Sequence, residues 1–397
     1  MKDLKFPYSK ADINNSDIKA VVQVLKKEYI AQGKVVQRFE EKLKNEFDVS
    51  EAIVCNSGTA ALHSVYRSLG LDKKNGIITT PITFLATANA AKMCGAPVFF
   101  ADVDSKTGLI TPKNLEEAFK RVKFQVKAVV VVHLGGHICD LEGLYKVAKK
   151  NNSFIIEDAC HAIGAIHHSK KKGFVGSCKY SLATTFSFHA IKNITMGEGG
   201  AVTTNDLALA NEIRLNISHG MIRNSNKMIR PPKDEPWYYQ MCNFGWNYRA
   251  SEISCALGLN QLKRIEKIIE KRNIIANLYK KYLNYNKFIK LPEFSNKKHG
   301  KGWHLFQLNI DFKKLKIKKQ DFMQYLRKHS IGTQVHYIPL VNQPYYSNNY
   351  EKKYLLGAQN FYKNTISIPM YTSLNAKDIK FISKVINNYF NKVICQV

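Results

Sequence analysis

The chain has 397 residues, of which 45% are hydrophobic and 23% are charged. This length allows two or three packed units with a large buried core, and the apolar content excludes a disordered chain. The formal charge of +29 would suit a nucleic acid, an anionic membrane or a phosphorylated ligand, because positive potential attracts each of them. Most of the excess follows residue 250 and is scattered among Asn, Ile, Tyr and Phe. A drift in composition explains it more simply than attraction of an anionic substrate.

Targeting and redox signals are few. The sequence has no run of about 18 uncharged apolar residues, which a spanning helix would need. Its opening residues lack the apolar core of a secretion signal. The eight cysteines are spread along the chain without a CxxC pair. We therefore expect a cytoplasmic protein with reduced thiols, no membrane contact and no metal site.

Two amphipathic helices are predicted first, one near residues 17–27 and one through Phe39, Leu43 and Phe47. From about residue 50, short apolar runs alternate with helical patterns. Such runs, separated by helices, predict a mostly parallel sheet of seven strands between helices, hence an α/β domain. The expected strands lie within residues 52–57, 76–81, 97–103, 128–134, 154–159, 180–189 and 199–206.

After the sheet, residues 251–283 predict one long helix or a broken pair, and the remainder mixes strands and helices. We expect a large domain over residues 1–260 and a smaller α+β domain over 261–397 that includes the connecting helix. The division could fall anywhere from residue 260 to 285, and the first 50 residues could belong to either domain.

The familiar nucleotide-binding motifs are missing, since the chain has neither GxxxxGK[ST] nor GxGxxG. Ligands of open parallel sheets bind at the carboxyl ends of the strands, so the turns there are the candidates. The first such turn, Asn56–Ala60, opens a helix whose free N–H groups and dipole would suit a phosphate. By itself this turn is more simply a helix cap.

The second turn follows the strand that ends in Glu157 and Asp158. An acid at this position is either a helix cap or a functional carboxylate. His161 could face the same crevice or lie satisfied in the core. The neighbouring Cys160, His167 and His168 do not add a recognisable zinc-ligand spacing.

The third turn carries Lys192, which precedes the glycine-rich residues 197–200. A buried lysine whose pKa falls becomes a nucleophile for carbonyls and can form a Schiff base. Pyridoxal 5′-phosphate (PLP) needs such a lysine, a carboxylate for its ring nitrogen, a phosphate cup and a flat partner. Candidates for these roles, in that order, are Lys192, Asp158, Ser57–Ala60 with Ser187, and Phe84 or His161.

These residues lie in segments that resemble a known family. "NSGTAAL", "TTPITFLATANAAKMCGAPVFFADVD", "EDACHAIGA", "TFSFHAIKNITMGEGGAVTTND" and "GWNYRASEISCALGLNQLKRIEK" look like the DegT/StrS-type sugar aminotransferases. The resemblance runs from about Phe6 to residue 390, and its SFHxxK…GEGG block is highly specific. It implies the fold of a fold-type I aminotransferase with PLP as cofactor.

The resemblance also implies roles for single residues. Lys192 matches the lysine that holds PLP and moves the proton during amino transfer. Lys192 is intact, whereas a dehydratase branch of the family has histidine there, and this favours transfer from L-glutamate to a keto-sugar nucleotide. Asn247 matches an asparagine that reaches the neighbouring subunit's cofactor, which implies a homodimer with shared active sites. The other implied positions are Asp158 at the ring nitrogen, His161 at the ring hydroxyl, Gly58, Thr59, Ala60 and Ser187 at the phosphate, and Phe84 against the ring.

Within the family, "HGMIR", "PWYYQMCNFGWNYRASEI" and "TQVHYIPLVNQPYY" look most like the branch that serves pseudaminic acid biosynthesis. This implies amination at the 4-position of UDP-2-acetamido-2,6-dideoxy-β-L-arabino-hex-4-ulose. The substrate contacts implied are Tyr8, Glu28, Tyr29, Ile30, Ala31, His336 and Tyr337.

Several alternatives stay open at this point. Tyr8 and the segment around His336 could simply pack the two domains together. Ala31 stands where many members have threonine, so a hydroxyl contact could be missing and another keto sugar, such as a perosamine or legionaminic-type precursor, could be the substrate. A basic nucleic-acid-binding regulator is the rival class, but the sequence has no helix-turn-helix, zinc-finger or RRM signature.

Overall fold

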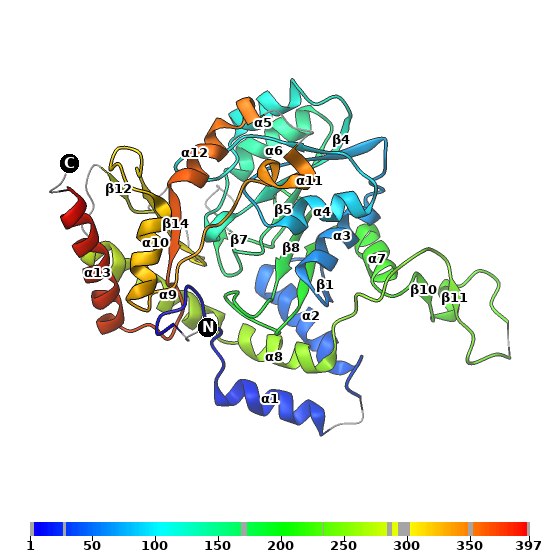
Figure 1. Ribbon diagram of the computed structural model, residues 1–397. Coiled ribbons are helices and arrows are strands. Elements are labelled where there is room, and N and C mark those ends of the chain that lie inside the picture. Colours follow the sequence, from blue (N-terminus) through cyan, green and yellow to red (C-terminus); the bar gives the residue numbers. More distant parts are fainter. Residues whose placement is uncertain are drawn as a thin grey trace.

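The structure is a computed structural model that describes residues 4–26, 29–167, 173–232, 234–283, 288–292, 302–347 and 352–394. A central sheet lies between layers of helices, a smaller C-terminal unit packs at one side, and a long arm projects at the other (Figure 1). In the part of the chain described, no helix is long and apolar enough to cross a membrane.

The central sheet has seven strands in the order β1-β9-β8-β5-β4-β2-β3. Neighbouring strands from β8 to β3 run parallel, whereas β9 is antiparallel to both of its neighbours. This confirms the mostly parallel seven-stranded sheet predicted from the apolar runs. Its strands are β1 (Glu51–Cys55), β2 (Asn75–Thr79), β3 (Val98–Phe100), β4 (Gln125–Val132), β5 (Phe154–Asp158), β8 (Ala183–Ser187) and β9 (Gly200–Thr204).

Both faces of the sheet are buried, and β1 shows how its residues divide between them. Successive side chains of a strand point to opposite faces. Ile53 and Cys55 join one apolar cluster with α3 (Gly58–Ser68) and α7 (Leu207–Asn216), while Ala52 and Val54 join another with helices α2 and α8. Further helices around the sheet are α4 (Leu85–Met93), α5 (Pro112–Phe119) and α6 (Leu141–Lys150).

The two N-terminal helices are α1 (Asn15–Leu25) and α2 (Lys34–Phe47), close to the predicted ranges. They pack on α8 (Glu252–Leu262). The carboxylate of Asp17 is buried and accepts hydrogen bonds from Gln261 and Arg264, at 2.8 and 2.6 Å. This contact ties α1 to the end of α8.

The predicted long helix is a broken pair, α8 and α9 (Ile265–Tyr282). Ile265 and Ile268 of α9 pack in a sheet-side core, whereas Ile275 and Tyr279 pack in the C-terminal core. The change of core thus occurs within the range of residues 260–285. A boundary at residues 260–261 is still a proposal. Farther along the chain, Leu340, Tyr346 and Phe361 pack against the sheet in the same apolar cluster as α3 and α7.

The C-terminal unit is built on a three-stranded antiparallel sheet, β12 (Ile289–Lys290), β13 (Phe306–Ile310) and β14 (Thr365–Ile368). Helices α10 (Lys319–Lys328), α12 (Leu356–Asn364) and α13 (Ala376–Ile394) accompany it. Residues 333–339 are irregular apart from a bridge between Gln334 and Ser367. The remaining short elements are β6 (Ile166–His167), β7 (Gly173–Phe174), β10 (Met221–Ile222), β11 (Gln240–Met241), α11 (Pro344–Ser347) and the 3₁₀ turns η1 (Leu134–Gly136), η2 (Ser225–Lys227), η3 (Leu340–Asn342) and η4 (Lys352–Tyr354).

Candidate active site

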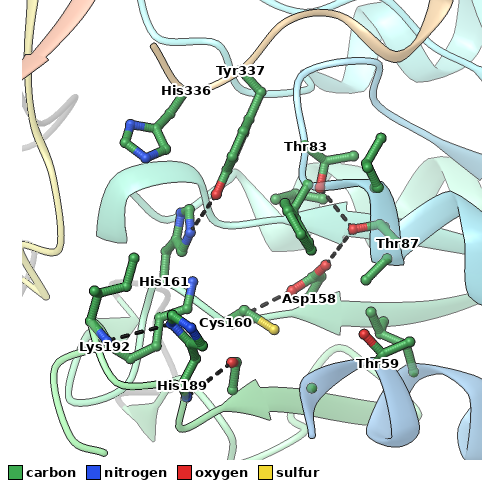
Figure 2. A pocket seen from close by; sticks show the side chains of 18 of the residues that line it. Thr59, Thr83, Thr87, Asp158, Cys160, His161, His189, Lys192, His336 and Tyr337 are labelled. Carbon is green, nitrogen blue, oxygen red and sulfur yellow. Dashed lines mark hydrogen bonds between the residues drawn. The ribbon is translucent and has the colours of Figure 1, made fainter. Parts of the chain in front are cut away.

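A cavity of about 620 Å³ lies where β5 and β8 end and α3 begins. The carboxyl ends of parallel strands meet at this edge, as expected for a ligand site of an open sheet. Figure 2 shows side chains from several segments pointing into it. Ten of the predicted site residues line it: Tyr8, Gly58, Thr59, Phe84, Asp158, His161, Ser187, Lys192, His336 and Tyr337.

Lys192 lies in the loop between β8 and β9, where its backbone N–H donates to the carbonyl of His189 at 2.9 Å. Its side-chain amine makes no hydrogen bond or ion pair with any described residue and faces the cavity. Burial lowers the pKa of this ammonium, and the nearby Asp158 carboxylate offsets part of the shift. The lowered pKa favours the neutral amine, the form that attacks a carbonyl.

Asp158 ends β5 with a buried carboxylate whose two oxygens are both held. One accepts from the hydroxyl of Thr87 at 2.7 Å, and the other from the backbone N–H of Cys160 at 3.2 Å. The Thr87 hydroxyl in turn lies 2.7 Å from that of Thr83. The sequence reasoning missed both threonines. Thr83 lies in the turn after β2 and Thr87 in α4, and their i, i+4 spacing was a local signal that could have linked them to each other.

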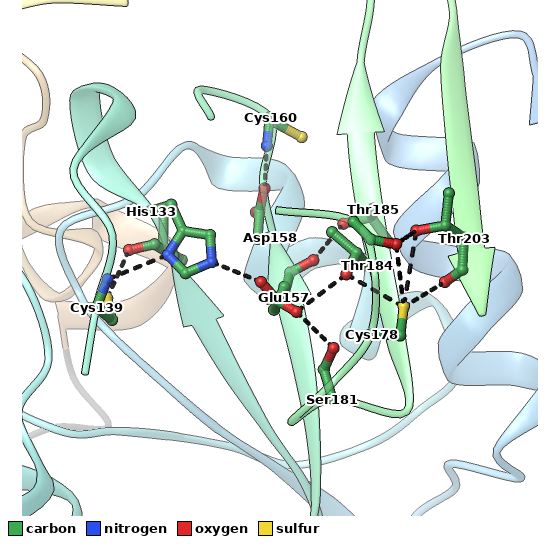
Figure 3. A network of polar contacts seen from close by, with 12 residues as sticks. His133, Cys139, Glu157, Asp158, Cys160, Cys178, Ser181, Thr184, Thr185 and Thr203 are labelled. Atoms are coloured by element: carbon green, nitrogen blue, oxygen red, sulfur yellow. Dashed lines mark hydrogen bonds and ion pairs between the residues drawn. The ribbon is translucent and has the colours of Figure 1, made fainter. Parts of the chain in front are cut away.

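The neighbouring acid, Glu157, does not line the cavity. Figure 3 shows it in a buried polar network behind the site. Its carboxylate lies 2.9 Å from His133 and accepts from Ser181 at 2.5 Å and from Thr184 at 3.1 Å. Because successive side chains of a strand point to opposite faces of the sheet, Asp158 lies at the cavity and Glu157 lies in the protein interior.

His161 lies between a backbone donor and a tyrosine. The N–H of Gly135 donates to its Nδ1 at 3.2 Å, and its Nε2 lies 3.0 Å from the hydroxyl of Tyr337. Gly135 sits in the turn after β4 with a left-handed φ of 67°, which glycine adopts readily. Burial, together with the charges of Lys192 and His336, holds the pKa of His161 well below its usual value. The ring is therefore neutral, with Nδ1 as acceptor and its proton on Nε2.

The start of α3 forms a small cup lined by Gly58 and Thr59. The side chain of Ser57 caps the helix by accepting from the N–H of Ala60 at 3.1 Å. The N–H groups of Gly58 and Thr59 have no partner among the described residues, so they can receive an anion. A Cβ on Gly58 would lie 2.9 Å from the Cβ of Ser187, so only glycine lets the end of β8 come this close.

Aromatic side chains complete the walls. Phe84 is 57% exposed, and its ring centroid lies 6.1 Å from that of Tyr337. The ring of Tyr8 lies 5.6 Å from that of His336, whose pKa burial lowers to about 3. His304, which the sequence reasoning also missed, packs its ring 4.5 Å from that of His161.

Five predicted site residues lie elsewhere. Ala60 does not line the cavity, because it sits inside α3 and its N–H bonds to Ser57. Asn247 is exposed outside the cavity, and its carbonyl accepts from Asn56 at 3.3 Å. Tyr29, Ile30 and Ala31 form an exposed turn that is held by the N–H of Glu252 and stays outside the cavity. Glu28 lies outside the described residues.

The donor set of this cavity fits PLP. An unpaired amine, a fixed carboxylate, free N–H groups at a helix start and an exposed aromatic ring face one space. These are the groups that an aldehyde, a pyridine nitrogen, a phosphate and a flat ring require. Among the residues that the structure describes, no group of three or more His, Cys, Asp or Glu could hold a metal ion.

Comparison with known proteins points to one family. The model of the DegT/DnrJ/EryC1/StrS aminotransferase family matches residues 11–387. The chain is 37% identical over 386 residues to the UDP-4-amino-4,6-dideoxy-N-acetyl-beta-L-altrosamine transaminase of Campylobacter jejuni, covering 97% of this chain and 98% of that protein. It is 34% identical over 385 residues to the spore coat polysaccharide biosynthesis protein SpsC of Bacillus subtilis, covering 96% of each.

A solved structure gives the same result. PseC of Helicobacter pylori, described as an aminotransferase involved in the biosynthesis of pseudoaminic acid, superposes with a TM-score of 0.87 at 34% identity. The match covers 98% of this chain and 99% of that chain.

Proposed function

The chain belongs to the DegT/DnrJ/EryC1/StrS aminotransferase family, and we propose that it aminates the 4-position of a UDP-linked 4-keto sugar with L-glutamate as donor. Family membership makes it a PLP-dependent sugar aminotransferase. The sugar, the amino donor, the site residues and the assembly are the parts that are proposed. The observation that carries the site assignment is the unpaired amine of Lys192 in one cavity with the fixed carboxylate of Asp158.

Bound PLP would supply an aldehyde for the amine of Lys192 and a protonated ring that accepts electrons during amino transfer. Asp158, fixed by Thr87 and the Cys160 N–H, would keep a proton on the ring nitrogen. The free N–H groups of Gly58 and Thr59 and the hydroxyl of Ser187 would hold the phosphate, Phe84 would cover the ring, and His161 would face its hydroxyl.

Lys192 has a second task in the proposed reaction. With its amine free, Nζ would take a proton from the carbon that loses it and would deliver that proton to the carbon that gains it. The lowered pKa suits this role, because a base works best when its pKa lies near the working pH. Tyr8, His336 and Tyr337 line the same cavity and are the proposed sugar contacts on this chain.

The proposed sugar is UDP-2-acetamido-2,6-dideoxy-β-L-arabino-hex-4-ulose. Support comes from the similarity to the Campylobacter transaminase and to PseC. SpsC is about as similar to this chain, and its name refers to spore coat polysaccharide rather than to pseudaminic acid. The alternative is therefore that the substrate is another nucleotide keto sugar. Incubation of the PLP-loaded enzyme with glutamate and a panel of UDP- and dTDP-keto sugars, followed by mass spectrometry, tests this. An amine formed only from another sugar would overturn the proposed substrate.

We also propose a homodimer whose active sites are shared. Asn247 lies outside its own cavity, next to an arm that carries β10 and β11 and extends from the body (Figure 1). The arm exposes large apolar side chains that a second copy could cover, namely Ile229, Trp237, Tyr239, Met241 and Phe244.

Mixing two inactive variants tests the shared site. In a mixed dimer of Lys192→Ala and Asn247→Ala chains, one of the two sites has both residues intact if Asn247 acts across the interface. Random mixing should then restore about a quarter of the wild-type activity. If Asn247 acts within its own chain, no mixed site is intact and no activity returns. The expected cytoplasmic location is a separate proposal, to be tested by cell fractionation.

A further inference from the structure

A second cavity, of about 560 Å³, lies in the C-terminal unit and is lined by residues of α10 and α12. We call it the α10–α12 cleft. Val335 lines both this cleft and the active-site cavity, so the irregular segment around it forms a common wall. None of the roles assigned above involves the other residues of the cleft.

All charged residues that line the cleft are cations. Lys319 and Arg327 come from α10 and Lys363 from α12, and no carboxylate of a described residue lines the cleft. Three cations that line one concave space without an acid create a positive potential there. Such a space attracts an anion more strongly than the evenly solvated lysines elsewhere on the surface.

Lys319 is the innermost of the three cations. Its ammonium donates to the carbonyls of Tyr362 and Thr365 and lies 4.7 Å from the centre of the Tyr362 ring. These partners are neutral, so they orient the ammonium without balancing its charge. Burial accordingly lowers the pKa of Lys319 to about 8. A bound anion would supply the missing negative charge.

Arg327 of α10 and Lys363 of α12 are both exposed to solvent and both line the cleft. Neither makes a hydrogen bond or an ion pair with a described residue. Their donors are therefore free for a ligand, and the guanidinium of Arg327 can bind two oxygens of a phosphate at once.

The remaining walls combine apolar and aromatic side chains with the uncharged polar Gln320, Gln324 and Thr333. Met323, Ile331 and Val335 line the cleft beside the ring of Tyr362. A space of this size and lining exceeds the needs of an inorganic ion and is typical of sites for organic ligands. An aromatic ring next to cations offers a stacking surface for a base together with donors for phosphates.

We propose that the α10–α12 cleft binds a nucleoside diphosphate, with Arg327, Lys363 and Lys319 on the phosphates and the Tyr362 ring on the base. The ligand could be the nucleotide half of a nucleotide sugar that reaches past Val335, or a free nucleotide that acts on the enzyme from outside its active site. The proposal does not depend on which sugar is aminated, because binding is measured without turnover.

The probe is UDP, added to the PLP-loaded full-length enzyme at low ionic strength. Hydrogen-exchange mass spectrometry should show slower exchange in peptides from α10 and α12. In the double variant Arg327→Gln/Lys363→Gln, this protection should be lost at the same UDP concentration. The UDP concentration that gives half-maximal protection should rise by about tenfold or more. The matched control is Lys328→Gln/Lys380→Gln, which removes the same charge from exposed positions outside the cleft and should behave as wild type.

Two further arms separate the sources of the ligand. If the substrate's nucleotide occupies the cleft, the double variant raises KM for the nucleotide sugar. If a free nucleotide is the ligand, KM stays unchanged while protection by UDP is lost. The proposal fails if UDP leaves α10 and α12 unprotected, if both double variants weaken binding equally, or if inorganic phosphate protects as well as UDP does.

Discussion

The Nε2 of His161 lies 3.0 Å from the hydroxyl oxygen of Tyr337, and the direction of this hydrogen bond follows from the other side of the ring. The N–H of Gly135 can only donate, so Nδ1 of His161 must accept from it. The proton of the neutral ring then sits on Nε2 and is donated to Tyr337. The hydroxyl hydrogen of Tyr337 is thereby free to point at an acceptor in the cavity.

Replacement of Tyr337 by phenylalanine tests this arrangement. The variant keeps the ring, but it removes the donor that the cavity ligand would use. We expect kcat/KM to fall by about tenfold, the usual effect of one lost hydrogen bond of about 1.4 kcal/mol. Steady-state kinetics would measure it, with circular dichroism as a control for folding. Unchanged kinetics would mean that the Tyr337 hydroxyl does not donate to the substrate or the cofactor.

Loss of charge at Glu157 should affect mainly the stability of the fold, whereas loss of charge at Asp158 should affect mainly PLP binding and turnover. Glu157→Gln breaks a buried pair with His133 and should lower the free energy of unfolding by about 3 kcal/mol, without removing any group from the cavity. Asp158→Asn should leave stability nearly unchanged but remove the carboxylate that the ring nitrogen needs. Urea unfolding and PLP titration of both variants check this. The assignment is wrong if PLP binding and turnover suffer in Glu157→Gln but not in Asp158→Asn.

The phosphate cup can be tested at a single glycine. A Cβ on Gly58 meets Ser187 at 2.9 Å, so Gly58→Ala must push α3 away from the end of β8. We expect PLP affinity to fall by about tenfold, because the free N–H groups at the helix start are displaced. Fluorescence titration of the PLP-free protein measures the affinity. As a control, Gly70→Ala adds a Cβ that would meet no atom within 4 Å. Because the φ of Gly70 is +70°, this variant should lower the free energy of unfolding but leave PLP affinity unchanged.

The free energy of unfolding should decrease as pH falls, because burial keeps histidines such as His137 neutral in the folded protein. Burial lowers the pKa of His137 to about 4, against about 6.5 in an unfolded chain. This contribution to stability is complete above pH 6.5 and is lost as pH falls toward 4. Between pH 7.5 and pH 5 it should amount to about 2 kcal/mol. Urea unfolding at both values should show a smaller difference for His137→Gln than for wild type, and an equal difference would contradict the assignment.

The sequence was most informative where chemistry follows from position in the sheet. Lys192, Asp158 and Gly58 were predicted as partners because each follows a strand of one parallel sheet, and the structure brings them to one cavity. Thr87 and Gly135 were not found. Spacing could link Thr87 to Thr83, but no local pattern encodes the contacts of Thr87 with Asp158 and of Gly135 with His161, because these partners lie in distant segments. Asn247 and the turn at Tyr29 stay outside the cavity of their own chain, so their roles depend on an assembly that one chain does not contain.

The central claim is that the amine of Lys192 holds PLP in this cavity. Borohydride reduction of the PLP-loaded enzyme should fix the cofactor covalently, and peptide mass spectrometry should place it on the peptide that contains Lys192. The Lys192→Ala variant should yield no labelled peptide, although it keeps the phosphate cup and Asp158. Stable label on another lysine of the wild-type protein, or none at all, would contradict the account.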